Sequence, residues 1–166
     1  MNPGRLLRHL VTPDWAVNRV LPRPAMQRIE EAIEASERRH GGQVRVAVEA
    51  ALDPWSVLRD LSARERAIDV FSALRVWDTE HNNGVLLYLL LADHDIEIVA
   101  DRGIARKVPD TQWEAICREM ESRLKNHDFE QAVITGIDAV SAHLARHFPP
   151  SGAPLNELPD SPVQIR

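Results

Sequence analysis

The chain has 166 residues, of which 44% are hydrophobic and 27% are charged, and its net charge is −5 at pH 7. This length suits one domain with a real core, and the composition excludes an intrinsically disordered chain. The mildly acidic balance argues against a general nucleic-acid-binding protein, and the single cysteine excludes an internal disulfide.

The sequence also bears on location. No run reaches the roughly 18 apolar residues that span a bilayer, so we expect no transmembrane segment. The first residues contain no apolar stretch of the secretory type. We therefore expect a cytoplasmic protein.

Residues 1–23 form an N-terminal arm that differs from the rest of the chain. The arm has four arginines against one acid, Asp14, and its apolar residues recur at helical spacing. A short basic amphipathic helix of this kind could hold the protein peripherally on an anionic membrane. The alternative, which we favour because the apolar face is short, is an arm that packs Leu6, Leu10 and Trp15 onto the domain.

Two helices and one strand are predicted between residues 24 and 75. Pro24 suits the first turn of a helix that ends at Gly41-Gly42. Val44, Val46 and Val48 then alternate with other residues, as in a strand. Residues 56–75 show the periodicity of a second helix. Its expected inward positions are Leu61, Ile68, Phe71 and Leu74.

A β-hairpin is predicted next. Residues 85–92 carry no charge, which is typical of a strand buried on both faces. The polar break at residues 93–95 follows, and Ile96, Ile98 and Ala100 then alternate with their neighbours as a partner strand would. A connection this short permits only antiparallel pairing.

Two further helices, beginning near Pro109 and Asp128, complete a domain that spans residues 24–148. Residues 149–166 form a tail with five prolines, which we expect to be extended or mobile. The order of elements predicts an α/β fold, a three-layer helix–sheet–helix sandwich whose mixed β-sheet contains a central antiparallel hairpin. We expect Leu86, Tyr88 and Leu90 on one face of the sheet, and Leu87, Leu89 and Leu91 on the other.

The hairpin predicts a candidate site. Antiparallel pairing brings the start of the first strand beside the end of the second, so their polar flanks should meet at one edge of the sheet. We call this set the acidic edge: Asp78, Glu80, Asn82, Asn83 and Asp101. Its ligands are all oxygen, which favours Ca²⁺ or Mg²⁺ over zinc. The neighbours His81 and Arg102 are candidate contacts for a substrate or partner. The alternative is that these residues only make turns.

The chain resembles the TPM domain family, which includes thylakoid-lumen and bacterial envelope proteins. The resemblance covers about residues 25–148 and is closest to a bacterial subgroup without signal peptide or transmembrane segment. It departs from the family at residues 126–129, where members usually have a glycine-containing turn. The matching segments are Gly41 to Val48, Ala67 to Phe71, Asn83-Gly84-Val85-Leu86-Leu87, Asp93 to Asp95, and Ile98 to Gly103. The resemblance implies a mixed α/β sandwich, divalent-cation binding, a phosphatase label and a link to membrane-protein maintenance.

The sequence contains partial matches to three enzyme or metal signatures. Asp93 and Asp95 follow an apolar strand as in haloacid dehalogenase phosphatases, but Glu97 stands where that motif needs threonine or valine, and a hairpin strand follows. Cys117 and Arg123 have the spacing of tyrosine phosphatases, but on a helix with acidic neighbours. His143 and His147 share a helix face without the glutamate of a metalloprotease.

Two classes of function remain. The first, which we favour, is an accessory or interaction module with a cation-dependent surface for a protein partner, with a membrane-associated partner as one option. The second is a weak metal-dependent phosphomonoesterase, in which a metal-bound water attacks and Arg66 or Arg102 holds the phosphate. The favoured class fits better because no residue stands out as a nucleophile.

Overall fold

The computed structural model describes residues 2–152 and 156–166. Its centre is a four-stranded mixed sheet in the order β3-β2-β1-β4. The strands are β1 (Gln43–Glu49), β2 (Gly84–Leu90), β3 (Asp95–Ala100) and β4 (Val163–Ile165). β1 runs parallel to both β2 and β4, whereas β2 and β3 form the predicted antiparallel hairpin.

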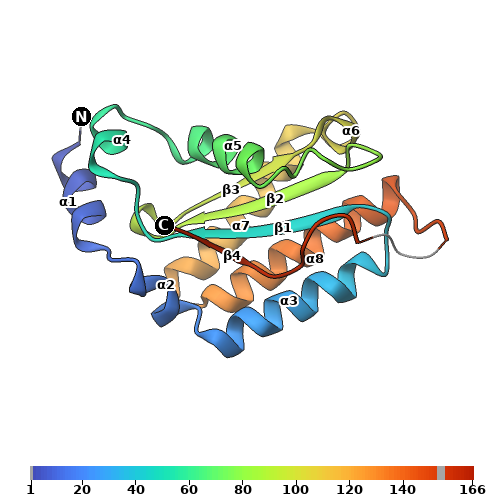
Figure 1. Ribbon diagram of the computed structural model, residues 1–166, viewed down its shortest axis with the longest axis horizontal. Coiled ribbons are helices and arrows are strands. Elements are labelled where there is room, and N and C mark those ends of the chain that lie inside the picture. Colours follow the sequence, from blue (N-terminus) through green and yellow to red (C-terminus); the bar gives the residue numbers. More distant parts are fainter. Residues whose placement is uncertain (1, 153–155) are drawn as a thin grey trace.

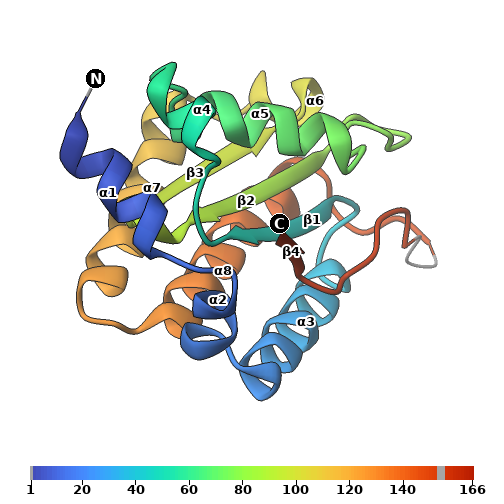
Figure 2. The same ribbon diagram turned by 60° about the vertical axis from the view of Figure 1, so that its left-hand side comes forward.

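Helices cover both faces of this sheet (Figures 1 and 2). One face packs against α3 (Arg23–Glu37), α7 (Asp110–Lys125) and α8 (Phe129–His147). The other face packs against α5 (Ala63–Ala73), with α4 (Pro54–Leu58) just before it in the chain. The predicted helix–sheet–helix sandwich is therefore confirmed. The remaining helices are α1 (Pro3–Val11), α2 (Trp15–Val20), the 3₁₀ turn η1 (Leu91–Asp93) and α6 (Arg102–Ala105).

The uncharged strand β2 lies at the centre of two apolar clusters. Leu87 and Leu89 belong to the cluster under α3, α7 and α8, together with Leu91. Leu86, Tyr88 and Leu90 belong to the cluster under α5. Every residue of β2 is buried, as predicted for a strand with no solvent-facing side.

The helix predicted over residues 56–75 is two helices. The chain leaves α4 at Arg59, and Asp60 has a positive φ of 57° that a continuing helix does not permit. Ser62 then begins α5 with a capping box in which its side chain and that of Glu65 exchange bonds with the backbone. On α5, Phe71 is buried as expected, whereas Ile68 is 45% exposed, although we expected it to face inward.

The tail adds a strand that the sequence did not predict. β4 pairs with β1 through Val163 to Ile165. Before it, the Gln43 side-chain oxygen accepts hydrogen bonds from the backbone N–H groups of Glu157 and Leu158, each at 2.9 Å. Leu158 is itself buried. The second half of the tail is therefore part of the sheet layer.

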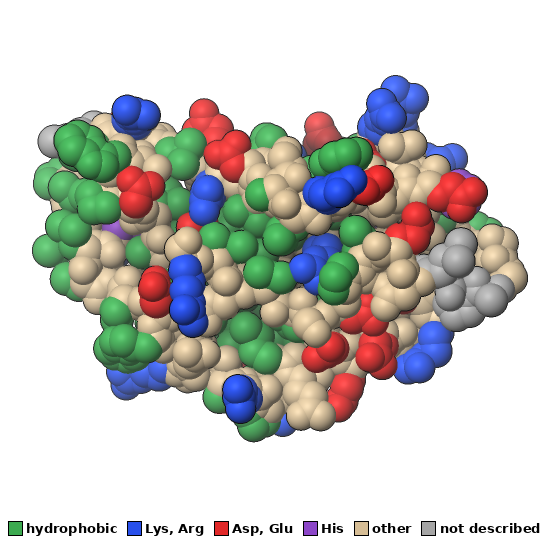
Figure 3. All heavy atoms as spheres, viewed as in Figure 1, with side chains coloured by type: hydrophobic (Ala, Val, Ile, Leu, Met, Phe, Trp, Pro, Cys, Tyr) green, Lys and Arg blue, Asp and Glu red, His purple; other side chains and the backbone are tan. Residues whose placement is uncertain are grey.

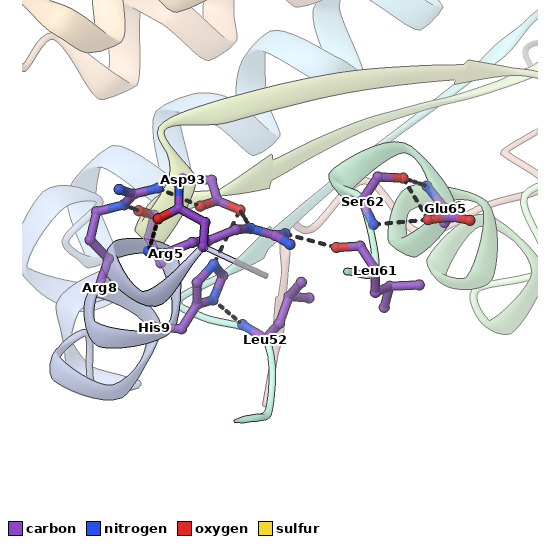
Figure 4. Close-up of polar contacts among 10 residues, drawn as sticks. Arg5, Arg8, His9, Leu52, Leu61, Ser62, Glu65 and Asp93 are labelled. Atoms are coloured by element: carbon purple, nitrogen blue, oxygen red, sulfur yellow. Dashed lines mark hydrogen bonds and ion pairs between the residues drawn. The ribbon is translucent and has the colours of Figure 1, made fainter. Parts of the chain in front are cut away.

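The N-terminal arm is docked through α1, which turns Arg5 and His9 toward the domain (Figure 4). Arg5 Nε, Arg8 Nη2 and His9 Nε2 lie 2.9, 3.2 and 3.1 Å from the Asp93 carboxylate. His9 Nδ1 also accepts a hydrogen bond from the Leu52 N–H at 2.9 Å. Burial raises the pKa of the Asp93 carboxyl, but hydrogen bonds from Arg5 and His9 outweigh burial, so this pKa is lowered overall.

Candidate functional site

The register of the hairpin places Asp101 where the sequence predicted. Val85 faces Ala100 at one end of the pair, and Leu90 faces Asp95 at the other. The Asp101 N–H donates to the Gly84 carbonyl at 2.9 Å. Asp101 therefore follows β3 beside the start of β2, at the end of the hairpin opposite Asp93.

The two exposed carboxylates of the acidic edge do not converge on Asp101. Asp78 forms a 2.7 Å ion pair with Arg75. Glu80 is exposed, and its backbone N–H is bound by the carboxylate of Glu157 at 2.9 Å. Within the described part of the chain, no three His, Cys, Asp or Glu side chains are placed to hold a metal ion together.

The two asparagines hydrogen-bond the loop before β2 to neighbouring segments of the chain. Asn82 has a φ of 51°, its carbonyl accepts from the Gly103 N–H at 2.8 Å, and its side-chain oxygen accepts from Arg102 Nε at 3.3 Å. A methyl group on Gly103 would come within 2.4 Å of that Asn82 carbonyl, so the close approach requires glycine. Asn83 donates from Nδ2 to the Gly41 carbonyl at 3.0 Å.

Two oxygens of the acidic edge are buried without a hydrogen-bond partner in the described structure. They are Asn83 Oδ1 and Asp101 Oδ2. The second oxygen of Asp101 accepts from the Arg102 N–H at 2.7 Å, which begins α6. Unpartnered buried oxygens are costly unless water or an ion satisfies them. These two oxygens therefore suit a hard cation as ligands, although they do not by themselves form a complete coordination shell.

A cavity of about 300 Å³ lies beside Asn83 and brings in residues that sequence reasoning missed. Glu80, His81 and Asn83 line it, together with Glu37 and His40 from the end of α3. Glu37 is the last residue of α3, and His40 lies three residues later in the turn that follows. The sequence alone carried no signal that the tail and the end of α8 would bury them.

Both missed residues are uncharged at neutral pH. Burial raises the pKa of Glu37 to about 8, although its carboxylate accepts a 2.8 Å hydrogen bond from the Val44 N–H. Burial lowers the pKa of His40 to about 4. His40 Nδ1 accepts from the Gly42 N–H at 3.2 Å, so the ring proton sits on Nε2, 3.3 Å from Ser141 Oγ. The cavity wall therefore offers a protonated carboxyl, which can donate a proton or a hydrogen bond.

Arg66, an expected phosphate contact, lies at the other end of the strands. Its guanidinium forms two 2.9 Å bonds with Glu49, the last residue of β1. Glu49 also accepts a 2.5 Å hydrogen bond from the Tyr88 hydroxyl. Of the expected contacts, Arg102 stays on the acidic edge and His81 lines the cavity, whereas Arg66 belongs to a buried network elsewhere.

A family model described as the TPM domain matches residues 17–143. The chain belongs to the TPM domain family. No curated protein matches it. Solved structures that share the fold include the following two. The BA42 protein of the psychrophilic bacterium Bizionia argentinensis is 28% identical, with a TM-score of 0.75, over 86% of this chain and 93% of that one. The N-terminal domain of a P. gingivalis protein is 16% identical, with a TM-score of 0.61, over 84% of this chain and 94% of that one.

Proposed function

We propose that this TPM domain is an accessory module that docks at the membrane–water interface, linked to the maintenance of membrane proteins. We also propose that its acidic edge binds Ca²⁺ or Mg²⁺. The docking proposal rests on one observation, an exposed apolar surface at the N-terminal end. We call this surface the apolar face: Leu7, Leu10, Val11, Trp15, Trp55 and Leu58. Hydrophobic side chains gather at the end of the molecule where α1 and α4 lie (Figure 3).

Helix α1 is oriented oppositely to an ordinary surface helix. Such a helix turns its apolar side to the core and its charges to water. Here Arg5 and His9 face Asp93, whereas Leu7 and Leu10 are each 61% exposed. Leu6 does pack onto the domain, but Leu10 and Trp15 do not, contrary to our expectation for the arm. The arm therefore presents Leu7, Leu10 and Val11 to a partner, together with the exposed part of the Arg8 side chain.

A membrane–water interface suits this surface. Exposed apolar patches mark sites of interaction with proteins or membranes. Trp15 and Trp55 are 60% and 72% exposed, and tryptophan is enriched at the boundary between water and lipid. None of the helices within residues 2–152 and 156–166 is both long and apolar enough to cross a bilayer. Docking would therefore be peripheral and made by side chains of the apolar face.

Vesicle binding tests the docking proposal. We expect the protein to co-float with vesicles of neutral or anionic phospholipid, with a blue shift of tryptophan fluorescence. Replacing both Leu7 and Leu10 with Ser should lower the partition coefficient more than about tenfold, because two leucines no longer enter the interface. Ile68→Ser is the matched control, since Ile68 is an exposed apolar residue outside the apolar face. Absence of vesicle binding by the unaltered protein would overturn the proposal.

The cation proposal is supported by Asp101 Oδ2 and Asn83 Oδ1, which have no partner in the described structure. Asp101, Asn82 and Asn83 would hold the ion, with Asp78 and Glu80 joining only after side-chain movement. The bound ion would neutralise negative charge at the edge and fix the loop before β2. In the alternative hydrolase, Arg102 is the remaining phosphate contact, since Arg66 is engaged by Glu49. We therefore rank the interaction module first.

A further inference from the structure

The outer side of β3 is an open sheet edge. β3 is the last strand in the order β3-β2-β1-β4, and no strand of the described residues pairs with its outer side. The Asp101 N–H bond to the Gly84 carbonyl fixes which backbone groups face β2. Alternation along the ladder then directs the N–H and C=O groups of Ile96, Ile98 and Ala100 away from β2. An edge of this kind is a template for a further strand.

This edge lies at the bottom of a groove between α5 and α7. The groove has a volume of about 510 Å³, and Ile96, Ile98 and Ala100 all line it. Figures 1 and 2 show β3 as the outer strand, with α5 and α7 on its two sides. The charged lining is mostly acidic: Asp95, Glu97, Asp110, Glu114 and Glu121 against Arg64 and Arg118.

The chain already places a cationic donor in this groove. The guanidinium of Arg64, from α5, donates to the outward carbonyl of Ile98 and lies 3.4 Å from the Glu97 carboxylate. The Cys117 sulfur, from α7, accepts a hydrogen bond from the outward N–H of Ile98. Both bonds agree with the outward direction derived from the ladder. Arg64 therefore shows which chemistry the groove accepts, a positively charged N–H donor that reaches the edge of β3.

One donor in the wall of the groove lacks a partner among the described residues, and several carboxylates there are crowded. The Trp113 side chain is 7% exposed and lines the groove, and its Nε1 donor has no hydrogen-bond partner in the described structure. Burial, with neighbouring carboxylates, raises the pKa values of Glu97 and Glu121. Burial and the neighbouring carboxylate of Asp93 also raise the pKa of Asp95. A ligand with positive charges would reduce the repulsion among these carboxylates.

We propose that the groove binds an extended peptide segment carrying Lys or Arg side chains, which adds to the sheet as a strand beside β3. The peptide backbone would bond the outward groups of Ile96 and Ala100, and it would displace Arg64 from the Ile98 carbonyl. Its basic side chains would meet Asp95, Glu97 and Glu121. Main-chain bonds supply affinity in this mode, and the side-chain surroundings supply specificity. This binding goes beyond docking by the apolar face.

A peptide titration tests the proposal. An acetylated peptide of alternating lysine and valine would be added to the full-length, ¹⁵N-labelled protein. We expect the amide signals of Ile96, Ile98 and Ala100 to shift. A control peptide with glutamate in place of lysine should leave these signals unchanged. A lysine–valine peptide N-methylated along its pairing side should also fail, because it cannot form the ladder bonds. Shifts confined to other surfaces, or equal binding of the N-methylated peptide, would overturn the proposal.

Protein variants separate the groove from general acidity. The double variant Glu97→Gln with Glu121→Gln should weaken the lysine–valine peptide about tenfold. Glu119→Gln is the matched control, because Glu119 is on α7 but does not line the groove. Arg64→Ala should strengthen binding, since it frees the Ile98 carbonyl. Equal weakening by the groove variant and the control would mean non-specific charge attraction and would also overturn the proposal.

Discussion

The Asp101 side chain uses one carboxylate oxygen to begin α6, through the bond from the Arg102 N–H at 2.7 Å. The other oxygen is buried without a partner in the described structure. A fold that needed only the cap would be served by an exposed aspartate. Burial of the second oxygen is therefore the residue-scale observation that most favours a bound cation.

Cation binding at Asp101 can be measured by thermal unfolding. We expect millimolar Ca²⁺ or Mg²⁺ to raise the melting temperature, because the ion binds only the folded chain. Asp101→Asn should abolish that rise and slightly raise stability without cation, since one buried charge is gone. Asp138→Asn, which removes an exposed carboxylate on α8, should leave the rise intact. A melting curve that does not change with either cation would contradict the site.

At the scale of elements, one carboxylate joins three side chains of α1 to the domain, beside single hydrogen bonds from α1 to Leu52, Leu61 and Ala92. The carboxylate of Asp93, the last residue of η1, pairs with Arg5, Arg8 and His9. The apolar face depends on this junction, because α1 turns Arg5 and His9 inward and leaves Leu7 and Leu10 outside. Loss of the Asp93 charge would therefore release a surface element without disturbing the strands beneath it.

Asp93→Asn should undock α1 locally. Removing one partner of a largely buried charge pair costs about 3–5 kcal/mol, so amide hydrogens of α1 and of Leu52 should exchange faster. The same should follow from acid, because the pKa of Asp93 is lowered in the folded chain and the stabilisation is lost as pH falls through that value. Glu130→Gln, which breaks the exposed pair with Arg28, is the control and should leave α1 protected. Unchanged exchange in α1 would show that apolar packing of Leu6 suffices.

At the scale of the whole molecule, the cavity beside Asn83 couples distant parts of the chain. The end of α3, the loop before β2, the end of α8 and the tail all contribute to its wall. Their meeting buries Glu37 and His40, whose pKa values move to about 8 and about 4. Global stability should therefore depend on pH near neutrality.

The free energy of unfolding should fall by about 2 kcal/mol between pH 6.5 and 8, because only the folded chain keeps a proton on Glu37 in that range. Below pH 6.5 the effect is offset, since the unfolded chain then binds a proton at His40 that the folded chain does not. Glu37→Gln should remove this fall in the free energy of unfolding, as measured by denaturant titration at each pH. The amide oxygen of the new side chain can still accept the hydrogen bond from the Val44 N–H. Glu31→Gln, at an exposed position on α3, should keep the fall. A flat profile in the unaltered protein would mean that Glu37 is ionised.

Much of the fold could be predicted from the sequence. The uncharged run at residues 85–92 and the short connection after it permit one arrangement, and both faces of β2 were assigned correctly. The position of Asp101 at the end of the hairpin away from Asp93 followed from the same reasoning. The break at Asp60 was missed, because helical periodicity continues across it and only the positive φ reveals the turn.

The sequence by itself determined the layers, the hairpin and the family, because periodicity and connection length are local properties of the chain. Only the tertiary structure decided which polar groups are buried and which apolar groups are not. Glu37 lies under a distant tail, α1 faces Asp93 across the chain, and β4 joins a strand more than a hundred residues earlier. Burial depends on which element covers a residue, and covering elements come from remote segments. The buried oxygens of the acidic edge, the apolar face and the groove beside β3 therefore become visible only when the chain is folded.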